Sequence, residues 1–123
     1  MTIGEVSEKT HLPESTLRYY EKKRLIIVSR QANGRRDYAE CDIAWILFIR
    51  RLKETGMPLK HIQRYSALRY AGDGTLPERL DMLQAHREYV LEQKRQWEQY
   101  LENLEEKIDI YRQMIHDAAD KMK

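Results

Sequence analysis

The sequence of 123 residues predicts a mainly α-helical fold that contains one small β-hairpin. Only 5 glycines and 3 prolines are present, so few positions would interrupt a helix. Apolar residues recur at helical spacing along most of the chain. The dipeptide Asn33-Gly34, which tolerates the positive φ angles of a tight turn, separates a β-branched apolar segment from a basic one. These observations predict a compact head over residues 1–71, followed by a long helix.

Residues 2–24 are predicted to form two short helices joined by a tight link. Thr2 and Glu5 have the spacing of a capping box, in which each side chain accepts a hydrogen bond from the other residue's backbone N–H. This helix is expected to end near His11. Pro13 opens the next helix, because proline suits the first helical position. Two helices joined so closely form a helix-turn-helix, whose second helix enters the major groove of DNA.

The second of these helices presents two different faces. Leu17 and Tyr20 are expected to pack against the first helix, whereas Arg18 and Tyr19 face outward. Arg and Tyr side chains pair with the phosphates of a nucleic-acid backbone. We therefore expect Arg18 and Tyr19 to contact DNA, together with Thr16 near the start of the same helix. The alternative interpretation is an ordinary exposed helix surface.

Residues 25–38 are predicted to form a β-hairpin that acts as a wing beside the helix-turn-helix. Residues 25–28 are apolar and three of the four are β-branched, so they supply its first strand, and the segment that contains Arg36 returns beside it. Arg35 and Arg36 would then lie at the tip, where side chains have no packing role, so phosphate contact is the favoured interpretation. Tyr38 could pack beneath the wing and still present its hydroxyl to a phosphate.

Residues 40–71 are predicted to form a second helix pair. Its apolar residues recur at helical spacing: Ile43, Trp45, Ile46, Leu47, Phe48, Ile49 and Leu52 in the first helix, and Ile62, Tyr65 and Leu68 in the second. Gly56 is expected to end the first helix. Lys60 and His61 lie early in the second helix, where free backbone N–H groups attract anions. They are candidates for a second phosphate clamp, with an ordinary solvated face as the alternative.

Residues 75–117 are predicted to form a long dimerisation helix, and residues 118–123 a tail. Apolar and aromatic residues repeat here with alternating spacings of 4 and 3, which is the pattern of a coiled coil. The positions predicted to hold the dimer together are Leu80, Leu83, Val90, Trp97, Leu101, Leu104, Ile108, Tyr111 and Ile115. We call this stripe, with Leu76, Arg87 and Lys94 at its remaining positions, the seam.

Arg87 and Lys94 are the two cations in the seam. In a parallel homodimer each would face its own copy and repel it. Antiparallel pairing places them opposite the C-terminal half of the helix, where Asp and Glu are plentiful. The sequence therefore predicts a winged helix-turn-helix head with a second helix pair and an antiparallel coiled coil. Parallel pairing remains the alternative.

Charge is segregated along the chain. Residues 1–70 hold 14 Lys or Arg against 8 Asp or Glu, whereas residues 71–123 hold 8 against 12. A basic head on an acidic tail predicts a polyanion, such as double-stranded DNA, as the partner of the head alone. The single cysteine fits a reducing compartment and no apolar run is long enough to span a bilayer, so we expect a cytoplasmic protein.

The order of the motifs resembles the MerR family of bacterial transcription regulators. The motifs are Thr16-Leu17-Arg18-Tyr19-Tyr20-Glu21, Gly34-Arg35-Arg36-Asp37-Tyr38, Asp42-Ile43, and Gly56-Met57-Pro58-Leu59 with Ile62. With no room for an effector domain, the chain is most similar to the NmlR/AdhR branch, which responds to aldehydes and other electrophiles. The resemblance implies a homodimer with an antiparallel coiled coil that binds a pseudo-palindromic promoter. It also implies that the dimer untwists an overlong promoter spacer so that RNA polymerase can use both promoter elements.

The chain departs from this branch at the position of the sensing cysteine, where it has Arg51. Its single cysteine, Cys41, lies earlier, at the start of the same helix and between two acidic residues that oppose a thiolate. We therefore expect that Cys41 is not the principal sensor, and the inducing signal stays unassigned. Ala39 replaces the family's usual capping Ser or Thr, and His11 stands where the family prefers glycine.

Other classes of function are not expected from the sequence. There is no glycine-rich phosphate loop, nucleophile motif or convergent set of carboxylates, so an enzyme is not expected, nor is a cofactor. The four histidines are scattered without a second ligand at metal-binding spacing, so no metal is expected. The competing function is an architectural or adaptor DNA-binding protein, whose coiled coil recruits a partner without remodelling a promoter.

Overall fold

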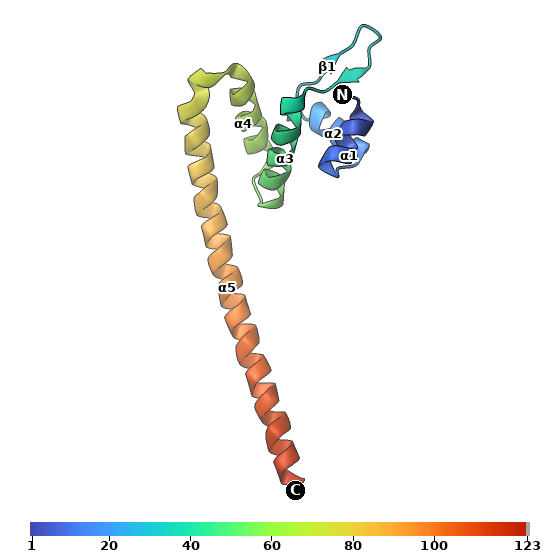
Figure 1. The fold of residues 1–123 in the computed structure, drawn as a ribbon. Coiled ribbons are helices and arrows are strands. Elements are labelled where there is room, and N and C mark those ends of the chain that lie inside the picture. The colour runs from blue at the N-terminus through green and yellow to red at the C-terminus, as the bar shows by residue number, and fades with distance from the viewer. Residues whose placement is uncertain (123) are drawn as a thin grey trace. The chain divides into compact units, whose positions relative to one another are not determined.

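The structure is a computed structural model that describes residues 1–122 (Figure 1). Its elements in chain order are α1 (Ile3–Thr10), α2 (Glu14–Lys22), β1 (Ser29–Arg30), β2 (Arg36–Asp37), α3 (Glu40–Glu54), α4 (Leu59–Ala71), the short 3-10 helix η1 (Asp73–Thr75) and α5 (Leu76–Lys121). The chain divides into two compact units, residues 1–84 and residues 85 onward. The mainly helical fold with one hairpin and a long C-terminal helix is confirmed.

Helix α1 begins at the predicted capping box. The Thr2 hydroxyl accepts from the Glu5 backbone N–H at 3.1 Å, and the Glu5 carboxylate accepts from the Thr2 N–H at 3.4 Å. The helix ends at His11, whose φ of 57° is left-handed. A side chain at such a residue costs about 1–2 kcal/mol, which explains why glycine is favoured there. Pro13 lies directly before α2, as the sequence predicted.

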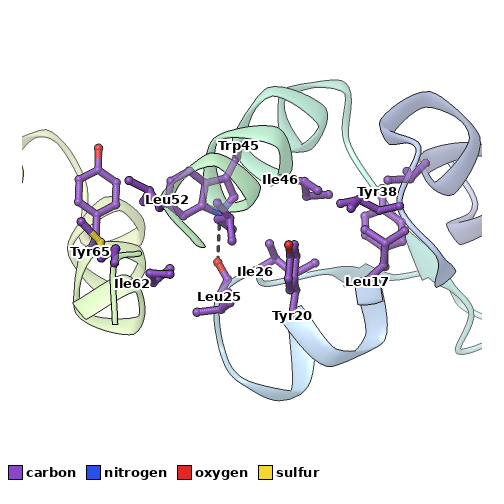
Figure 2. Close-up of a cluster of buried hydrophobic side chains, with 14 residues drawn as sticks. Leu17, Tyr20, Leu25, Ile26, Tyr38, Trp45, Ile46, Leu52, Ile62 and Tyr65 are labelled. Atoms are coloured by element: carbon purple, nitrogen blue, oxygen red, sulfur yellow. Dashed lines mark hydrogen bonds between the residues drawn. The ribbon is translucent and has the colours of Figure 1, made fainter. Parts of the chain in front are cut away.

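The core of the first unit forms where α1, α2, α3 and α4 meet the segment that leads into the hairpin (Figure 2). Leu17 and Tyr20 of α2 are buried with Val6 of α1, so the predicted inner face of α2 is confirmed. On α3, the indole of Trp45 stacks on Tyr65 of α4 with ring centroids 5.7 Å apart. Burial of these apolar and aromatic side chains is the main force that holds the helices together.

The β-hairpin is shorter than predicted and begins later. The strands pair antiparallel, with Ser29 opposite Asp37 and Arg30 opposite Arg36. The prediction that residues 25–28 form the first strand was wrong. Leu25 is fully buried and Ile26 nearly so, because both side chains enter the helical core instead of lying along a two-stranded ribbon.

Four hydrogen bonds fix the segment that carries the hairpin, which we call the wing base (residues 23–27). The carbonyl of Leu25 accepts from the indole of Trp45 at 3.1 Å, drawn as a dashed line in Figure 2, and from the hydroxyl of Ser66 at 2.6 Å. The carbonyl of Lys23 accepts from the side-chain amide of Gln63 at 2.9 Å. The backbone N–H of Ile27 donates to the hydroxyl of Tyr70 at 3.0 Å. Helix α4 therefore holds the wing base along one face.

The second helix pair, α3 and α4, has ends that follow from the sequence. Ala39 precedes α3 and offers no side-chain cap, although its N–H donates to the Asp42 carboxylate at 2.8 Å. Gly56 follows α3 with a φ of 89°, a conformation that glycine adopts without strain. Ile62 and Tyr65 of α4 are buried, as their helical spacing predicted.

Helix α5 is continuous from Leu76 to Lys121, so it extends beyond the predicted end at residue 117. No side chain of α5 is fully buried. Among the described residues of the second unit, the large apolar side chains along the predicted seam are exposed, with 69% of Trp97 and 69% of Ile115 accessible. The seam, apolar except for Arg87 and Lys94, therefore has no packing partner among the described residues of the second unit.

Candidate nucleic-acid interface

Helix α2 presents Arg18 outward, as predicted. The side chain is about half exposed, and its guanidinium lies 3.5 Å from the carboxylate of Glu14 one turn earlier. An ion pair at this exposed spacing is weak, so Arg18 can exchange it for a phosphate at little cost. Thr16 lies in the first turn of the same helix and is half-buried.

Tyr19 is half-buried rather than fully outward, and two lysine ammonium groups lie over its ring. The ammonium of Lys53 from α3 lies 4.8 Å from the centre of its ring, and that of Lys23 lies 5.8 Å away. Both distances are within the range of a cation–π contact. Sequence reasoning missed both lysines. Nothing in the local pattern pointed to Lys53, because it reaches the ring from another helix.

The hairpin is joined to α2 through one carboxylate, that of Glu21. Its Oε1 lies 2.8 Å from Nη2 of Arg30 and 3.3 Å from Nη2 of Arg36. The expectation that Arg36 has no packing role was therefore wrong, since it lies on β2 with its side chain about three-quarters buried against Glu21. Sequence reasoning also missed Arg30. Its pairing with Arg36 across the hairpin would have revealed it if the strands had been placed correctly.

Arg35 lies in the tight loop between the two strands and is exposed. The loop is closed by backbone bonds between Gln31 and Arg35 at 2.8 Å and between Gly34 and Gln31 at 2.9 Å, with Gly34 at a φ of 83°. The Asn33 side chain accepts from the Arg35 N–H at 3.0 Å. Within residues 1–122, the guanidinium of Arg35 takes part in no ion pair. Arg30 and Arg36 are paired with Glu21, so among the described arginines of the hairpin Arg35 is the one whose guanidinium can bind an external anion without breaking an ion pair.

Tyr38 packs beneath the hairpin, and only 2% of the residue is exposed. Its hydroxyl is buried and has no hydrogen-bond partner within the described chain. Burial raises the pKa of Tyr38 above its usual value, and the nearby guanidinium of Arg36 partly opposes this effect. The packing that sequence reasoning anticipated is present, but the hydroxyl is not presented to solvent. A role for Tyr38 in DNA contact stays a prediction.

The other predicted phosphate contacts lie at the start of α4. Lys60 and His61 are both exposed there, directly after Pro58. Arg64 on the next turn is 3.6 Å from the carboxylate of Glu78, and both side chains are exposed. The structure therefore leaves Lys60 and His61 accessible to an anion, whereas Arg64 already has an acidic neighbour.

Cys41 and Arg51 lie on the same helix, α3, and both are exposed. Cys41 is in the first turn and Arg51 in the last. A separation of ten positions corresponds to about 15 Å of helical rise, so the two residues do not form one site.

No group of three or more His, Cys, Asp or Glu side chains between residues 1 and 122 is arranged to hold a metal ion. Across the same residues, none of the helices combines the length and the apolar character needed to cross a membrane.

Two family models match this chain. The model described as MerR HTH family regulatory protein matches residues 1–68, and the model described as MerR, DNA binding matches residues 43–107. Between them they include the helix-turn-helix, the hairpin, the second helix pair and much of α5.

Solved structures and curated relatives agree with these models. A putative MerR family transcriptional regulator from Listeria monocytogenes is similar with a TM-score of 0.92 and 31% identity, covering 100% of this chain and 94% of that one. HiNmlR, a MerR family regulator lacking the sensor domain and solved bound to promoter DNA, gives a TM-score of 0.81 and 34% identity, with 91% and 90% covered. AdhR of Bacillus subtilis is 38% identical over 93 residues, which are 75% of this chain and 66% of AdhR.

Proposed function

Because this chain belongs to the MerR family of helix-turn-helix transcriptional regulators, we propose that it binds a pseudo-palindromic promoter as a homodimer and remodels an overlong spacer. The chain is a DNA-binding regulator and not an enzyme. The proposal includes a cytoplasmic location, where promoter DNA and RNA polymerase are found. RNA polymerase would be an indirect partner that meets the dimer at the promoter.

The cluster of cations on α2 and the hairpin is the observation that carries the DNA-binding part of the proposal. Arg18 and Arg35 are exposed, Arg36 forms an ion pair with Glu21 of α2, and Lys53 lies over the ring of Tyr19. Such a set suits phosphate contacts, which position a protein on DNA without reading its sequence. A relative of the same fold, HiNmlR, has been solved bound to promoter DNA. Thr16, Tyr38, Lys60 and His61 complete the contacts that we propose.

The exposed seam of α5 supports the homodimer. Leu101 and Leu104 are each more than half exposed, as is Trp97. Burial of one such side chain contributes about 1.5–3 kcal/mol, so pairing of two seams would stabilise a dimer strongly. Leu104→Asp would bury a charge in this interface and should yield a monomer in analytical ultracentrifugation, whereas Gln96→Asp, outside the seam, should remain dimeric. A dimer of the Leu104 variant at micromolar concentration would show that the seam does not form the interface.

Transcription in vitro tests the remodelling directly. The binding site would first be selected from random duplex DNA and then placed in the spacer of a promoter that is otherwise inactive because the spacer is too long. The proposal predicts that the protein activates this promoter but not a matched promoter with a spacer of ordinary length. Equal transcription with and without protein on the long spacer would instead favour the second candidate, an architectural or adaptor protein that binds DNA and recruits a partner through the coiled coil.

A further inference from the structure

The chain that enters the hairpin is bound by three residues of α3 and α4, which we call the clasp: Trp45, Arg69 and Tyr70. The indole of Trp45 donates to the carbonyl of Leu25 at 3.1 Å (Figure 2). The hydroxyl of Tyr70 accepts from the backbone N–H of Ile27 at 3.0 Å. The clasp therefore binds the backbone of the wing base at two positions, shortly before strand β1 begins.

Arg69 joins the two aromatic members of the clasp. Its guanidinium carbon lies 4.4 Å from the centre of the Trp45 ring and 5.2 Å from the centre of the Tyr70 ring. Both distances are within the range of a cation–π contact. Within residues 1–122 this guanidinium takes part in no ion pair and no hydrogen bond. A planar cation that lies over both rings links their positions, and with them the positions of the two groups that bind the wing base.

The last turn of α4, which carries two members of the clasp, is itself bound to the start of α5. The hydroxyl of Thr75 donates to the carbonyl of Leu68 at 2.6 Å. Arg79 donates from Nε to the Thr75 hydroxyl at 3.0 Å and from Nη2 to the carbonyl of Gly72 at 3.3 Å. All of these residues belong to the first compact unit. The clasp thus has a defined position relative to the helical core.

The hydrogen bond between Ile27 and Tyr70 lies at the surface, where 63% of Ile27 and 36% of Tyr70 are exposed. Water would satisfy both groups if this bond were broken, so its contribution to the free energy of unfolding is small. Its main effect is to fix the direction in which the chain leaves the core. A residue with this property acts on the position of the hairpin more than on the stability of the fold.

Small changes at the wing base are enlarged at the hairpin loop. Gln31, where the loop begins, is four residues beyond Ile27, which corresponds to up to about 13 Å of extended chain. A tilt of about 10° at the wing base would displace the loop by about 2 Å, which is enough to break a hydrogen bond to a phosphate. The exposed guanidinium of Arg35 lies in this loop.

We propose that the clasp positions the hairpin on DNA, so that Tyr70 and Arg69 are positioning residues for the phosphate contact of Arg35. The inference rests on the proposed DNA contact of the hairpin, and it names residues outside that interface on which the contact depends. Side chains that bind a ligand need such support from neighbours that fix their position.

Other contacts hold other parts of the hairpin. The carboxylate of Glu21 pairs with the arginine of each strand. After β2, the carbonyl of Met1 accepts from the N–H of Tyr38 at 2.8 Å. The clasp supports the side on which the chain enters the hairpin.

A double-mutant cycle on DNA affinity tests the clasp. The probe is the duplex selected from random DNA, and the full-length proteins are the wild type, Tyr70→Phe, Arg35→Ala and the double variant. Tyr70→Phe should weaken binding at least about threefold and make the salt slope shallower, as the loss of a phosphate contact does. Arg35→Ala should then weaken binding of the Tyr70→Phe protein much less than binding of the wild type, because changes that act through one contact do not add.

Three further variants separate positioning from a general loss of structure. Arg18→Ala, on α2, should weaken binding by the same factor with and without Tyr70→Phe. Tyr65→Phe is the matched control, because it removes from α4 a hydroxyl that makes no hydrogen bond within residues 1–122, and it should bind like the wild type. Arg69→Lys keeps the charge, but an ammonium cannot lie flat over both rings. It should therefore reproduce the non-additivity with Arg35→Ala.

The possible results distinguish the inference from the proposed function. Wild-type affinity of Tyr70→Phe, or full additivity of Tyr70→Phe and Arg35→Ala, would overturn the inference and leave the proposed function intact. If Tyr70→Phe also removes the effect of Arg18→Ala, the clasp supports the whole head and the positioning role is wrong. If Arg35→Ala alone binds like the wild type, the hairpin makes no phosphate contact, and the inference fails together with that part of the proposed interface.

Discussion

Arg36 of the hairpin lies with its Nη2 atom 3.3 Å from Oε1 of Glu21 on α2. Both side chains are about three-quarters buried, and the same carboxylate also holds Arg30. The ion pair therefore joins the hairpin to the helix that is proposed to enter the major groove. The two elements can then present their cations to DNA as one surface.

A double-mutant cycle measures what this ion pair contributes to stability. Glu21→Gln and Arg36→Gln, alone and combined, should give a coupling of about 1 kcal/mol in the free energy of unfolding, at the upper end for pairs near a surface. The exposed pair of Glu14 and Arg18 is the control and should give about 0.3–0.5 kcal/mol. Equal couplings for the two pairs, measured by urea unfolding, would show that Glu21 does not fix the hairpin.

Tyr38→Phe should stabilise the head and distinguish the two roles of this residue. It removes a buried hydroxyl that has no partner, whose desolvation costs about 1–3 kcal/mol. Its melting temperature should therefore rise. Unchanged DNA affinity would assign Tyr38 to the core alone, whereas weaker binding of this more stable variant would support the predicted phosphate contact.

The same substitution should alter stability at alkaline pH. Because burial raises the pKa of Tyr38 in the folded state, the unfolded chain loses its phenolic proton first as the pH rises. The part of the free energy of unfolding that depends on the protonation of Tyr38 is therefore fully present below about pH 10. It is lost as the pH rises through the folded-state pKa of Tyr38. The wild type should lose stability more steeply than Tyr38→Phe in this range, and parallel curves would contradict the assignment.

Ala39→Ser should stabilise helix α3. Ala39 already has the extended conformation of a helix cap, with φ −88° and ψ 158°, but no side-chain acceptor for the free N–H groups of the first turn. A serine there should add about 1 kcal/mol to the free energy of unfolding. Glu40→Ser, one residue later, is the control. A serine at position 39 that gives no gain in thermal or urea unfolding would show that the first turn needs no further cap.

Cys41→Ser should leave any response to aldehydes unchanged. The thiol is exposed at the start of α3, but Arg51, at the position of the family's sensing cysteine, is in the last turn of that helix. A promoter-reporter assay with formaldehyde and methylglyoxal compares the wild type with the variant. A response that is present in the wild type and absent from Cys41→Ser would show that the sensing thiol has moved to position 41.

The sequence predicted the helices well because their signals are local. The capping box of Thr2 and Glu5, and the periodic burial of Leu17 and Tyr20, depend only on neighbours within one or two turns. The family motifs also identified the class of protein correctly. The seam of α5 is the longest of these periodic patterns, and the continuous helix was found from it.

The hairpin and its charges were predicted less well because they depend on distant contacts. Residues 25 and 26 have strand-like side chains, but Trp45 and Ser66 bind the backbone at Leu25 and draw it into the core. Tertiary packing thus outweighed β propensity. In the same way, no local pattern indicated that Glu21 would pair with Arg36, or that Lys53 would lie over Tyr19.

The salt dependence of DNA binding tests the central claim most directly. Arg35 is exposed and makes no ion pair among residues 1–122, so Arg35→Ala should change DNA contact without changing stability. On promoter DNA, the slope of log affinity against log salt should become shallower by about 0.9, the value for one lost phosphate contact, on specific and random duplexes alike. Arg112→Ala, an exposed residue in the C-terminal part of α5, is the control and should leave both affinity and slope unchanged. If Arg35→Ala binds with the affinity and salt slope of the wild type, the hairpin does not contact DNA and the proposed interface is wrong.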